Sequence, residues 1–293
     1  MAKKIISPTT PNKRYVNYLF ARTFPVWKKY KIGAPVIKQV PPNSCWIIHW
    51  WRNTKELSDM DKYHLDVLVR AKSMFKKVMV FYASVYPPPK ELAGCYIVRI
   101  ANDVTRGENN SFIETLAQCL LGNFDYVLRT HFKLKKNYDE GRKKNVRFWC
   151  KLMYDECFNV SGFETSTYGA IDCHDRRWLD PYLAALPGKW HALVDSTYQN
   201  NYAGSFIWYN CKRFREWASA NNVTLDDIKQ LNGDEVQGKT WLCEVLITAI
   251  FKEINAKYHI DFSPYVIFDY FILHGRDFNA LVNGVKKCDT KGL

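Results

Sequence analysis

The residues best suited to chemistry lie in one short run, Asp-Tyr-Val-Leu-Arg-Thr-His-Phe-Lys at positions 125–133. Its first four residues, Asp125 to Leu128, have the apolar character of a buried strand. Arg129, His131 and Lys133 follow at once. In an open α/β sheet, ligands bind just beyond the carboxyl ends of the strands. A cluster of cations at such a place would neutralise a diphosphate, and no Asp-x-Asp pair of metal-binding carboxylates follows this strand.

Hydrophobic patterning predicts the elements that must hold this run in place. Ser58 or Asp59 would cap a first helix, and a capping box from Ser111 to Glu114 would open a second helix, which Gly122 would end. This order of elements is typical of α/β proteins with a mostly parallel sheet flanked by helices. We expect strands at 45–51, 78–84, 96–100 and 125–128, and helices at 60–77 and 111–121.

The second half of the chain is less regular. Its expected elements are a basic loop at 136–147, helices at 148–158, 213–220 and 239–256, and an aromatic strand at 201–209. With 293 residues, of which 47% are hydrophobic, the chain can bury a sizeable core. We see no apolar run long enough to span a bilayer and no secretory signal. The nine cysteines are scattered without a CxxC pair, which favours reduced thiols in a cytoplasmic protein.

Four loops would converge at one edge of the sheet, because right-handed crossovers bring the ends of parallel strands together. They offer aromatic faces for a base, amides for hydroxyls and cations for phosphates. Each residue also has a simpler interpretation: His49 as a core residue, the asparagines as turn residues, and the cations as ion-pair partners of Asp103 or Glu108. The candidate donor-binding residues of these loops are His49, Arg52, Asn53, Asn102, Asn109, Arg129, His131 and Lys133.

The net charge of +13 is concentrated at the N-terminus. Residues 1–55 contain eleven Lys or Arg and no Asp or Glu, interleaved with aromatic residues. This pattern suits an anionic membrane surface or nucleic acid phosphates. The simpler interpretation is a solvent-facing arm that packs its aromatic residues on the domain.

The sequence lacks the motifs of several common enzyme classes. There is no GxGxxG after the first strand and no GxxxxGK[ST], so dinucleotide and P-loop sites are disfavoured. A GxSxG elbow is missing as well. Cys173, His174 and Asp175 are adjacent, and adjacent residues rarely form a working nucleophile and base.

Four short motifs then occur in order: His131-Phe-Lys133, Phe148-Trp-Cys-Lys-Leu-Met153, Tyr168-Gly-Ala-Ile171 and Tyr202-Ala-Gly-Ser-Phe-Ile-Trp208. Between about residues 45 and 250, this order resembles a family of bacterial and viral glycosyltransferase-like proteins. The family has a GT-A-like, Rossmann-like fold for nucleotide-diphospho-sugars, with His-Thr-Lys-Gly and Ser-Gly-Asn-Phe-Trp-Trp motifs. This chain departs from the pattern at Leu134, Asn201, Ser205 and Ile207.

The resemblance implies a transferase that uses a nucleotide-sugar donor and a hydroxyl acceptor. Arg129, His131 and Lys133 would neutralise the leaving diphosphate, and Mn²⁺ or Mg²⁺ is a further way to do so. Gly204 and Trp208 would form the floor of the donor site, or else belong to a core strand with Gly204 at a close packing point. An inverting enzyme needs a carboxylate base, for which the candidates are Asp172, Asp175, Asp195 and Glu244.

We expect a basic aromatic arm at 1–41 and one GT-A-like domain at 42–293. Its nucleotide-binding half would be 42–135 and its acceptor and sugar half 136–293. A lipid-linked glycan at the inner membrane face would suit surface or capsular polysaccharide assembly. Two alternatives remain: a phage-type DNA glycosyltransferase acting on hydroxymethylated bases, and a basic nucleic-acid-binding protein without enzymatic activity.

Overall fold

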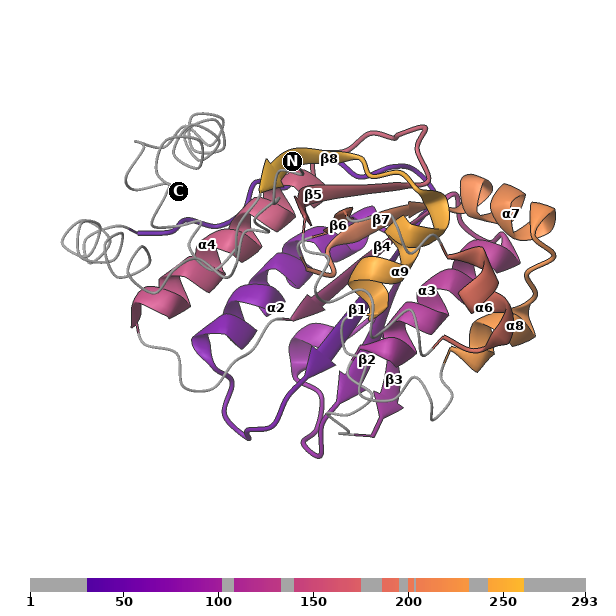
Figure 1. Ribbon diagram of the computed structural model, residues 1–293. Helices are drawn as coiled ribbons and strands as arrows, with labels where there is room; N and C mark the ends of the chain where they lie inside the picture. The colour runs from indigo at the N-terminus through magenta and orange to yellow at the C-terminus, as the bar shows by residue number, and fades with distance from the viewer. Residues whose placement is uncertain are drawn as a thin grey trace, which may run out of the picture.

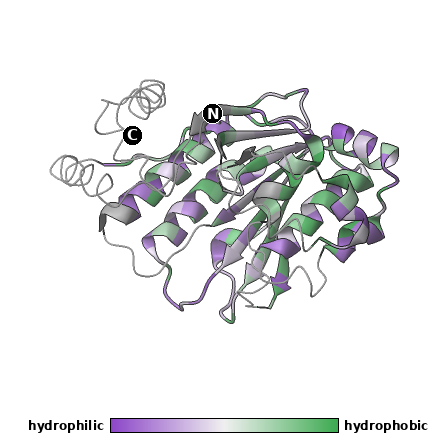
Figure 2. Ribbon diagram, in the orientation of Figure 1, coloured by the Kyte–Doolittle hydropathy of each residue, from purple (hydrophilic) through white to green (hydrophobic). Residues whose placement is uncertain are grey.

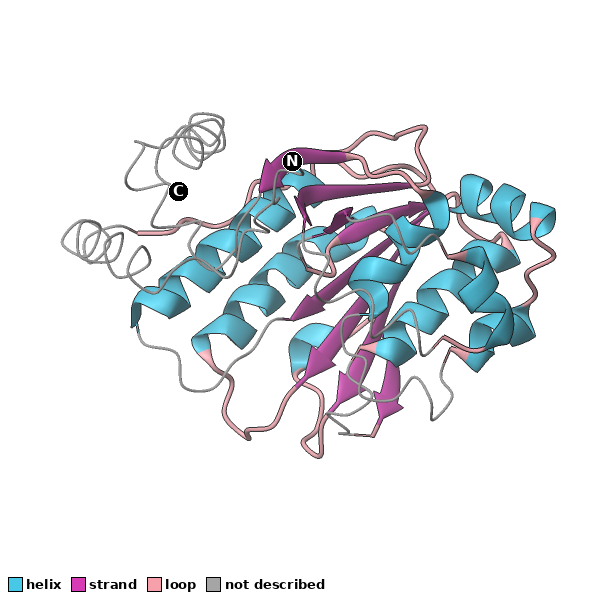
Figure 3. Ribbon diagram, in the orientation of Figure 1, coloured by secondary structure: helices cyan, strands magenta, loops and turns pink. Residues whose placement is uncertain are grey.

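The computed structural model describes residues 31–101, 108–132, 140–174, 186–194, 200–202, 204–231 and 242–260. Their centre is an eight-stranded sheet with the order β3-β2-β1-β4-β7-β5-β6, in which β8 pairs with β5 (Figures 1 and 3). The strands are β1 (Ser44–Trp51), β2 (Lys77–Ala83), β3 (Tyr96–Ile100), β4 (Tyr126–Phe132), β5 (Thr167–His174), β6 (Asn200–Tyr202), β7 (Ile207–Asn210) and β8 (Ala256–Ile260).

The strand directions confirm the expected mostly parallel sheet. Strands β3, β2, β1 and β4 are parallel neighbours. Strand β7 is antiparallel to both β4 and β5, so β5 runs in the same direction as β4. Since β8 is parallel to β5 and β6 is antiparallel to it, only β6 and β7 among the described strands run against the others. The carboxyl ends of β1 to β4 therefore lie along one edge.

Helices cover both faces of this sheet, as Figure 1 shows. Because successive strand side chains point to opposite faces, Trp46, Ile48 and Trp50 of β1 join one core, which includes residues of α2 and α4. Cys45 and Ile47 join a second core with α3, α7 and α9. The helices are α2 (Asp59–Ala71), α3 (Asn109–Leu121), α4 (Glu140–Cys157), α6 (Gly188–Leu193), α7 (Cys211–Ala220), α8 (Leu225–Gln230) and α9 (Leu242–Phe251).

The start of α2 is fixed by a capping box. The Ser58 hydroxyl accepts a hydrogen bond from the Asp61 amide, and the Asp61 carboxylate accepts one from the Ser58 amide. Such a cap stabilises a helix by about 0.5–2 kcal/mol. The helix ends at Ala71 and not at residue 77, because a short 3-10 helix at Lys72–Met74 follows it. Helices such as α4 and α7 carry both hydrophilic and hydrophobic stretches (Figure 2), as expected for helices with one buried side.

The predicted capping box at Ser111 is wrong. Helix α3 begins at Asn109, with Glu108 at the N-cap position and without a side-chain cap. The Ser111 hydroxyl lies inside the first turn and donates to the Glu108 carbonyl at 2.8 Å. The predicted end is correct, since Gly122 adopts a left-handed conformation with φ 78°.

The second half of the chain departs further from the prediction. Residues 136–147 are not all loop, because α4 begins at Glu140. The single strand expected at 201–209 is two strands, β6 and β7, and α9 ends at Phe251, before strand β8. Strand β5 was not predicted as a strand, although it carries the Tyr168-Gly-Ala-Ile171 motif. These strands form by pairing with strands that are distant in the sequence, so a local sequence pattern does not predict them.

Gly204 lies at the close packing point that one interpretation of the sequence anticipates. A Cβ at this position would lie 2.5 Å from Cζ2 and 2.7 Å from Cη2 of Trp149, and φ is +91°. Gly94 has a similar φ of +83°, but nothing lies within 4 Å of its Cβ position. The two glycines therefore share the conformational requirement and differ in the steric one.

We expect Gly204→Ala to destabilise the protein by more than Gly94→Ala. Both substitutions force an L-residue into the left-handed region, which costs about 1–2 kcal/mol. Only Gly204→Ala also drives a methyl group into the Trp149 ring, and such overpacking typically adds about 1–3 kcal/mol. Urea denaturation of the two variants measures the difference. Equal losses of stability would mean that Trp149 moves aside without cost.

Candidate functional site

The candidate site lies where β1 and β4 run side by side toward the carboxyl edge of the sheet. His49 of β1 and His131 of β4 are register partners. Arg129, two residues before His131, lies on the same face of the sheet. Strand β4 continues to Phe132, so the expectation that it ends at Leu128 is wrong. Arg129 and His131 are consequently strand residues with fixed backbone positions, and not part of a loop beyond the strand.

Glu108 lies between the side chains of Arg129 and His131 and contacts both. Arg129 Nη2 donates to Glu108 Oε2 at 2.6 Å, and His131 Nδ1 lies 3.0 Å from Glu108 Oε1. The Arg129 side chain is completely buried, whereas that of Glu108 is 20% exposed. The alternative in which Arg129 pairs with Glu108 is therefore confirmed. The charge of Arg129 is compensated inside the protein, and Glu108 bridges the N-terminus of α3 to strand β4.

Further contacts tie the cluster to the second half of the chain. The Ser111 hydroxyl lies 3.3 Å from Arg129 Nη2. From α9, the Cys243 thiol approaches Glu108 Oε2 at 3.8 Å, and Ser205 Oγ lies 3.4 Å from Cys243 Sγ. Glu108 is thus the point at which α3, β4 and α9 meet.

The charges in this cluster follow from burial and from the neighbouring groups. Burial alone would raise the pKa of Glu108, but His131 and Arg129 outweigh it and hold that pKa well below its usual range. Burial lowers the pKa of His49 to about 4, and the charge of Arg129 acts in the same direction. At neutral pH Glu108 is therefore ionised and His49 is a neutral imidazole.

Several buried polar atoms around the cluster have no hydrogen-bond partner in the structure as described. Buried polar groups in proteins are normally hydrogen bonded, so a group of such atoms at a strand edge is a place where a ligand can bind. His49 is 6% exposed and Asn109 is 3% exposed. The atoms are His49 Nδ1, Asn109 Oδ1, Arg129 Nε, Arg129 Nη1 and Tyr209 Oη.

Arg52 has a local structural role. Its Nη1 donates to Tyr82 Oη at 3.0 Å and to the Pro87 carbonyl at 3.1 Å, and its Nη2 donates to the Lys55 carbonyl. Arg52 thereby joins the loops that follow β1 and β2. The adjacent Asn53 is half-buried. Binding of a donor by Arg52 or Asn53 stays a prediction.

Trp208 lies in the core of the sheet. It is completely buried, its Nε1 donates to the Cys157 carbonyl at 2.9 Å, and its ring stacks on Phe75 with a centroid distance of 5.9 Å. Together with the packing of Gly204, this placement matches the core-strand interpretation of residues 202–208. Binding of a donor by Gly204 or Trp208 stays a prediction.

The remaining candidates are not placed in the site by the structure. Asn102, Lys133, Asp175 and Asp195 lie outside the described residues. Asp172 belongs to β5 and Glu244 to α9, but their side chains are not described. The choice of a catalytic base among the four predicted carboxylates therefore stays a prediction. Glu108 is missing from those candidates because, in the sequence, it is only one of two acidic residues in the polar loop at 102–109.

A divalent metal would need several oxygen or nitrogen ligands at one place. Among the side chains that the structure describes, no three His, Cys, Asp or Glu residues are arranged to hold one. The side chains of the predicted carboxylates Asp172, Asp175, Asp195 and Glu244, which could supply such ligands, are not described. Use of Mn²⁺ or Mg²⁺ stays a prediction.

Solved structures resemble the chain only loosely. CMP:2-keto-3-deoxy-manno-octonic acid synthetase complexed with CTP has 9% identity over 75% of this chain and 90% of that one, with a TM-score of 0.30. Galactosyltransferase LgtC with donor and acceptor sugar analogs has 13% identity over 72% and 73%, with a TM-score of 0.27. Core-mannan synthase A from Aspergillus fumigatus in its Mn/GDP form has 14% identity over 78% and 75%, with a TM-score of 0.31.

No protein-family model matches the sequence, and no curated protein matches it significantly. TM-scores near 0.3 carry no functional conclusion.

The buried neutral His49 predicts a dependence of stability on pH. In the unfolded chain its pKa returns to about 6.5, whereas in the folded protein it is about 4. The unfolded state therefore binds more protons between these values, and stability falls as the pH is lowered from about 6.5 toward 4. The full contribution, present above pH 6.5, is on the order of 3 kcal/mol.

Urea denaturation between pH 7.5 and 5 measures this loss, and His49→Gln should make the dependence shallower. His191→Gln, at an exposed position, is the matched control and should leave the slope unchanged. A slope in His49→Gln that equals the wild-type slope would show that His49 is not the group responsible.

Proposed function

We propose that the protein is a glycosyltransferase with a GT-A-like fold, which moves a sugar from a nucleotide-sugar donor to a hydroxyl acceptor. The observation that carries the proposal is the buried cluster of Glu108, Arg129 and His131 at the carboxyl edge of parallel strands. Open α/β sheets bind their ligands at this edge. The motif order described above supplies the class of ligand, and the unpartnered atoms of His49 and Asn109 supply donor-binding groups.

The cluster suits a reaction in which negative charge develops on a departing diphosphate. The Glu108 carboxylate lies 3.0 Å from His131 Nδ1 and would help to orient that ring. Arg129 holds Glu108 in turn, so the group nearest to the leaving phosphate would be preorganised. Lys133, two residues further along the chain, would add charge. The acceptor hydroxyl would lose its proton to one of Asp172, Asp175, Asp195 and Glu244 if the enzyme inverts.

Binding of the donor is the decisive test. Thermal-shift measurements with uridine, guanosine, cytidine and thymidine diphosphates and their sugars, with and without Mn²⁺, should find at least one stabilising ligand. A ligand at 100 times its Kd adds about 2.7 kcal/mol to the stability of the folded state. Calorimetry then gives the affinity. If none of these nucleotides binds in either condition, the proposal fails.

The acceptor is proposed to be a lipid-linked glycan, in surface or capsular polysaccharide assembly at the inner membrane face. The seven Lys or Arg of residues 1–30, without any acidic residue, would contact the anionic surface. Residues 36–39 are tied to the protein, because the Val36 amide donates to Asp155 Oδ1 at 2.6 Å and the Lys38 amide to the Phe158 carbonyl at 2.9 Å. In the described part of the chain, no helix is long and apolar enough to cross a membrane.

Deletion of residues 1–30 tests this assignment. We expect the truncated protein to lose association with anionic liposomes and to keep its affinity for the donor nucleotide. Loss of donor affinity in a folded truncated protein, with liposome binding unchanged, would contradict the assignment. If the deletion instead abolishes salt-sensitive binding to DNA, the acceptor is DNA, as for a phage-type enzyme acting on hydroxymethylated bases. DNA binding without any nucleotide binding would indicate a nucleic-acid-binding protein without enzymatic activity.

A further inference from the structure

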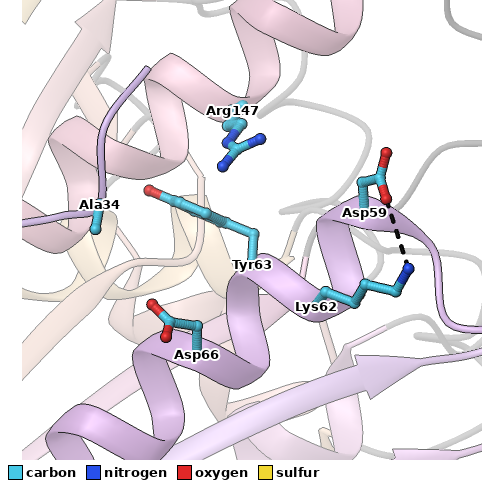
Figure 4. Close-up of a pocket in the computed structure, with 6 residues that line it drawn as sticks. All are labelled: Ala34, Asp59, Lys62, Tyr63, Asp66 and Arg147. Carbon is cyan, nitrogen blue, oxygen red and sulfur yellow. Dashed lines mark ion pairs between the residues drawn. The ribbon is translucent and has the colours of Figure 1, made fainter. Parts of the chain in front are cut away.

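A cavity of about 330 Å³ opens between α2 and α4, on the face of the sheet opposite the Glu108 cluster. Figure 4 shows its walls: Lys62 and Asp66 of α2, Arg147 of α4, and Ala34 from the segment before β1. Asp59 and Tyr63 complete the lining. Its volume lies at the lower end of the range for small-molecule sites, about 300–1,000 Å³, which suits a small ligand.

The cavity contains polar groups that the described residues leave without a hydrogen bond. Tyr63 is only 6% exposed, yet neither its hydroxyl nor Arg147 Nε has a hydrogen-bond partner among the residues that the structure describes. The Arg147 guanidinium lies over the Tyr63 ring, 4.9 Å from its centroid. In Figure 4 the Tyr63 hydroxyl is directed toward Ala34 across the cavity. Because buried polar groups are normally paired, an external partner for this hydroxyl is indicated.

The charges of the lining residues indicate which class of ligand the cavity would bind. Asp59 and Asp66 balance Lys62 and Arg147, so the described part of the lining has no net charge. A second cavity, of about 360 Å³, is lined by Lys72, Lys76 and Lys77, has no acidic residue in its described lining and would suit an anion. The cavity at Tyr63 instead combines carboxylate acceptors at the rim, a guanidinium donor and a hydroxyl that can do both. Such a set matches a neutral ligand rich in hydroxyl groups.

We propose that the cavity between α2 and α4 is a binding site for a neutral saccharide unit, separate from the donor site. The choice of a saccharide among hydroxyl-rich ligands rests on the proposed glycosyltransferase function. Strand β1 leads into α2 and β4 leads into α4, so both helices begin on the side of the carboxyl edge. An acceptor glycan held by one of its sugar units at Tyr63 and Arg147 would thereby be kept near that edge.

Saturation-transfer difference NMR of the full-length protein tests the proposal, with methyl glycosides of glucose, galactose, mannose and N-acetylglucosamine and their disaccharides as probes. We expect saturable binding of at least one probe. Tyr63→Phe and Arg147→Met should each weaken it about tenfold, as expected for loss of one ligand hydrogen bond. Tyr63→Phe removes a hydroxyl to which no described residue is hydrogen bonded, so the variant should remain folded. Tyr96→Phe, at a 59% exposed tyrosine of the second cavity, is the matched control and should bind like the wild type.

The outcomes separate this proposal from that of the donor site. Absence of binding for every sugar, or equal binding by wild type, Tyr63→Phe and Arg147→Met, overturns the saccharide site. Competition by inorganic phosphate that depends on Arg147 also overturns it, because the ligand would then be an anion. Nucleotide binding measured by calorimetry on the same variants should be unchanged. Sugar binding without nucleotide binding would sink the transferase proposal and leave this site standing.

Discussion

Glu108→Gln is expected to lower the free energy of unfolding by about 3–5 kcal/mol, the usual cost of removing one partner of a buried ion pair. Arg129 is completely buried and would keep its charge without a carboxylate nearby. Urea denaturation at pH 7 measures the loss. Glu216→Gln is the matched control, since Glu216 forms an exposed pair with Lys212 at 4.0 Å. Exposed pairs contribute about 0–1 kcal/mol.

A double variant distinguishes the effect of charge on stability from the effect of packing. Glu108→Leu combined with Arg129→Met removes both charges, and it should recover most of the stability that Glu108→Gln loses. The pH dependence gives an independent check. The pKa of Glu108 is lowered by folding, so its stabilising effect is present above the unfolded pKa and lost as the pH falls through the folded value. A double variant as unstable as Glu108→Gln would show that packing at this position, and not charge, determines stability.

His131→Ala is expected to reduce turnover by about 10²–10³-fold, equivalent to roughly 2.7–4 kcal/mol of barrier, while affinity for the sugar-free nucleoside changes little. The physical reason is that charge on the departing phosphate grows toward the transition state, so a preorganised group acts more strongly there than in the ground state. Lys133→Ala should behave in the same way. Release of nucleoside diphosphate from the donor identified by thermal shift gives kcat, and calorimetry gives the nucleoside affinity.

The competing interpretation is that His131 only completes the ion pair with Glu108. In that case His131→Ala would lower stability, and turnover by the folded fraction would stay near that of the wild type. His191→Ala, at an exposed histidine of α6, controls for unspecific effects of removing an imidazole. Wild-type turnover in both His131→Ala and Lys133→Ala would remove the main support for a catalytic cluster at this edge.

The first half of the fold could be predicted from local patterns. Strand β3 occurs at the predicted residues 96–100, β1 and β2 lie within one residue of their predicted bounds, and Ser58 and Gly122 cap helices as expected. These elements carry their own signals, since apolar runs, caps and glycines act on neighbouring residues. Strand β5 and the separation of β6 from β7 depend on partners far away in the sequence, and a local pattern does not report such pairing.

The sequence by itself determined the kinds of groups near the carboxyl edge of the sheet: basic side chains next to a buried apolar run, and a polar loop before a helix. Only the tertiary structure decided which of them meet. Glu108 and Arg129 are 21 positions apart and Cys243 is 135 positions from Glu108, yet Glu108 contacts both. Tyr63 and Arg147 became a pair because α2 and α4 lie on the same face. Ion pairing and burial depend on distance in space, and the folded sheet fixes that distance.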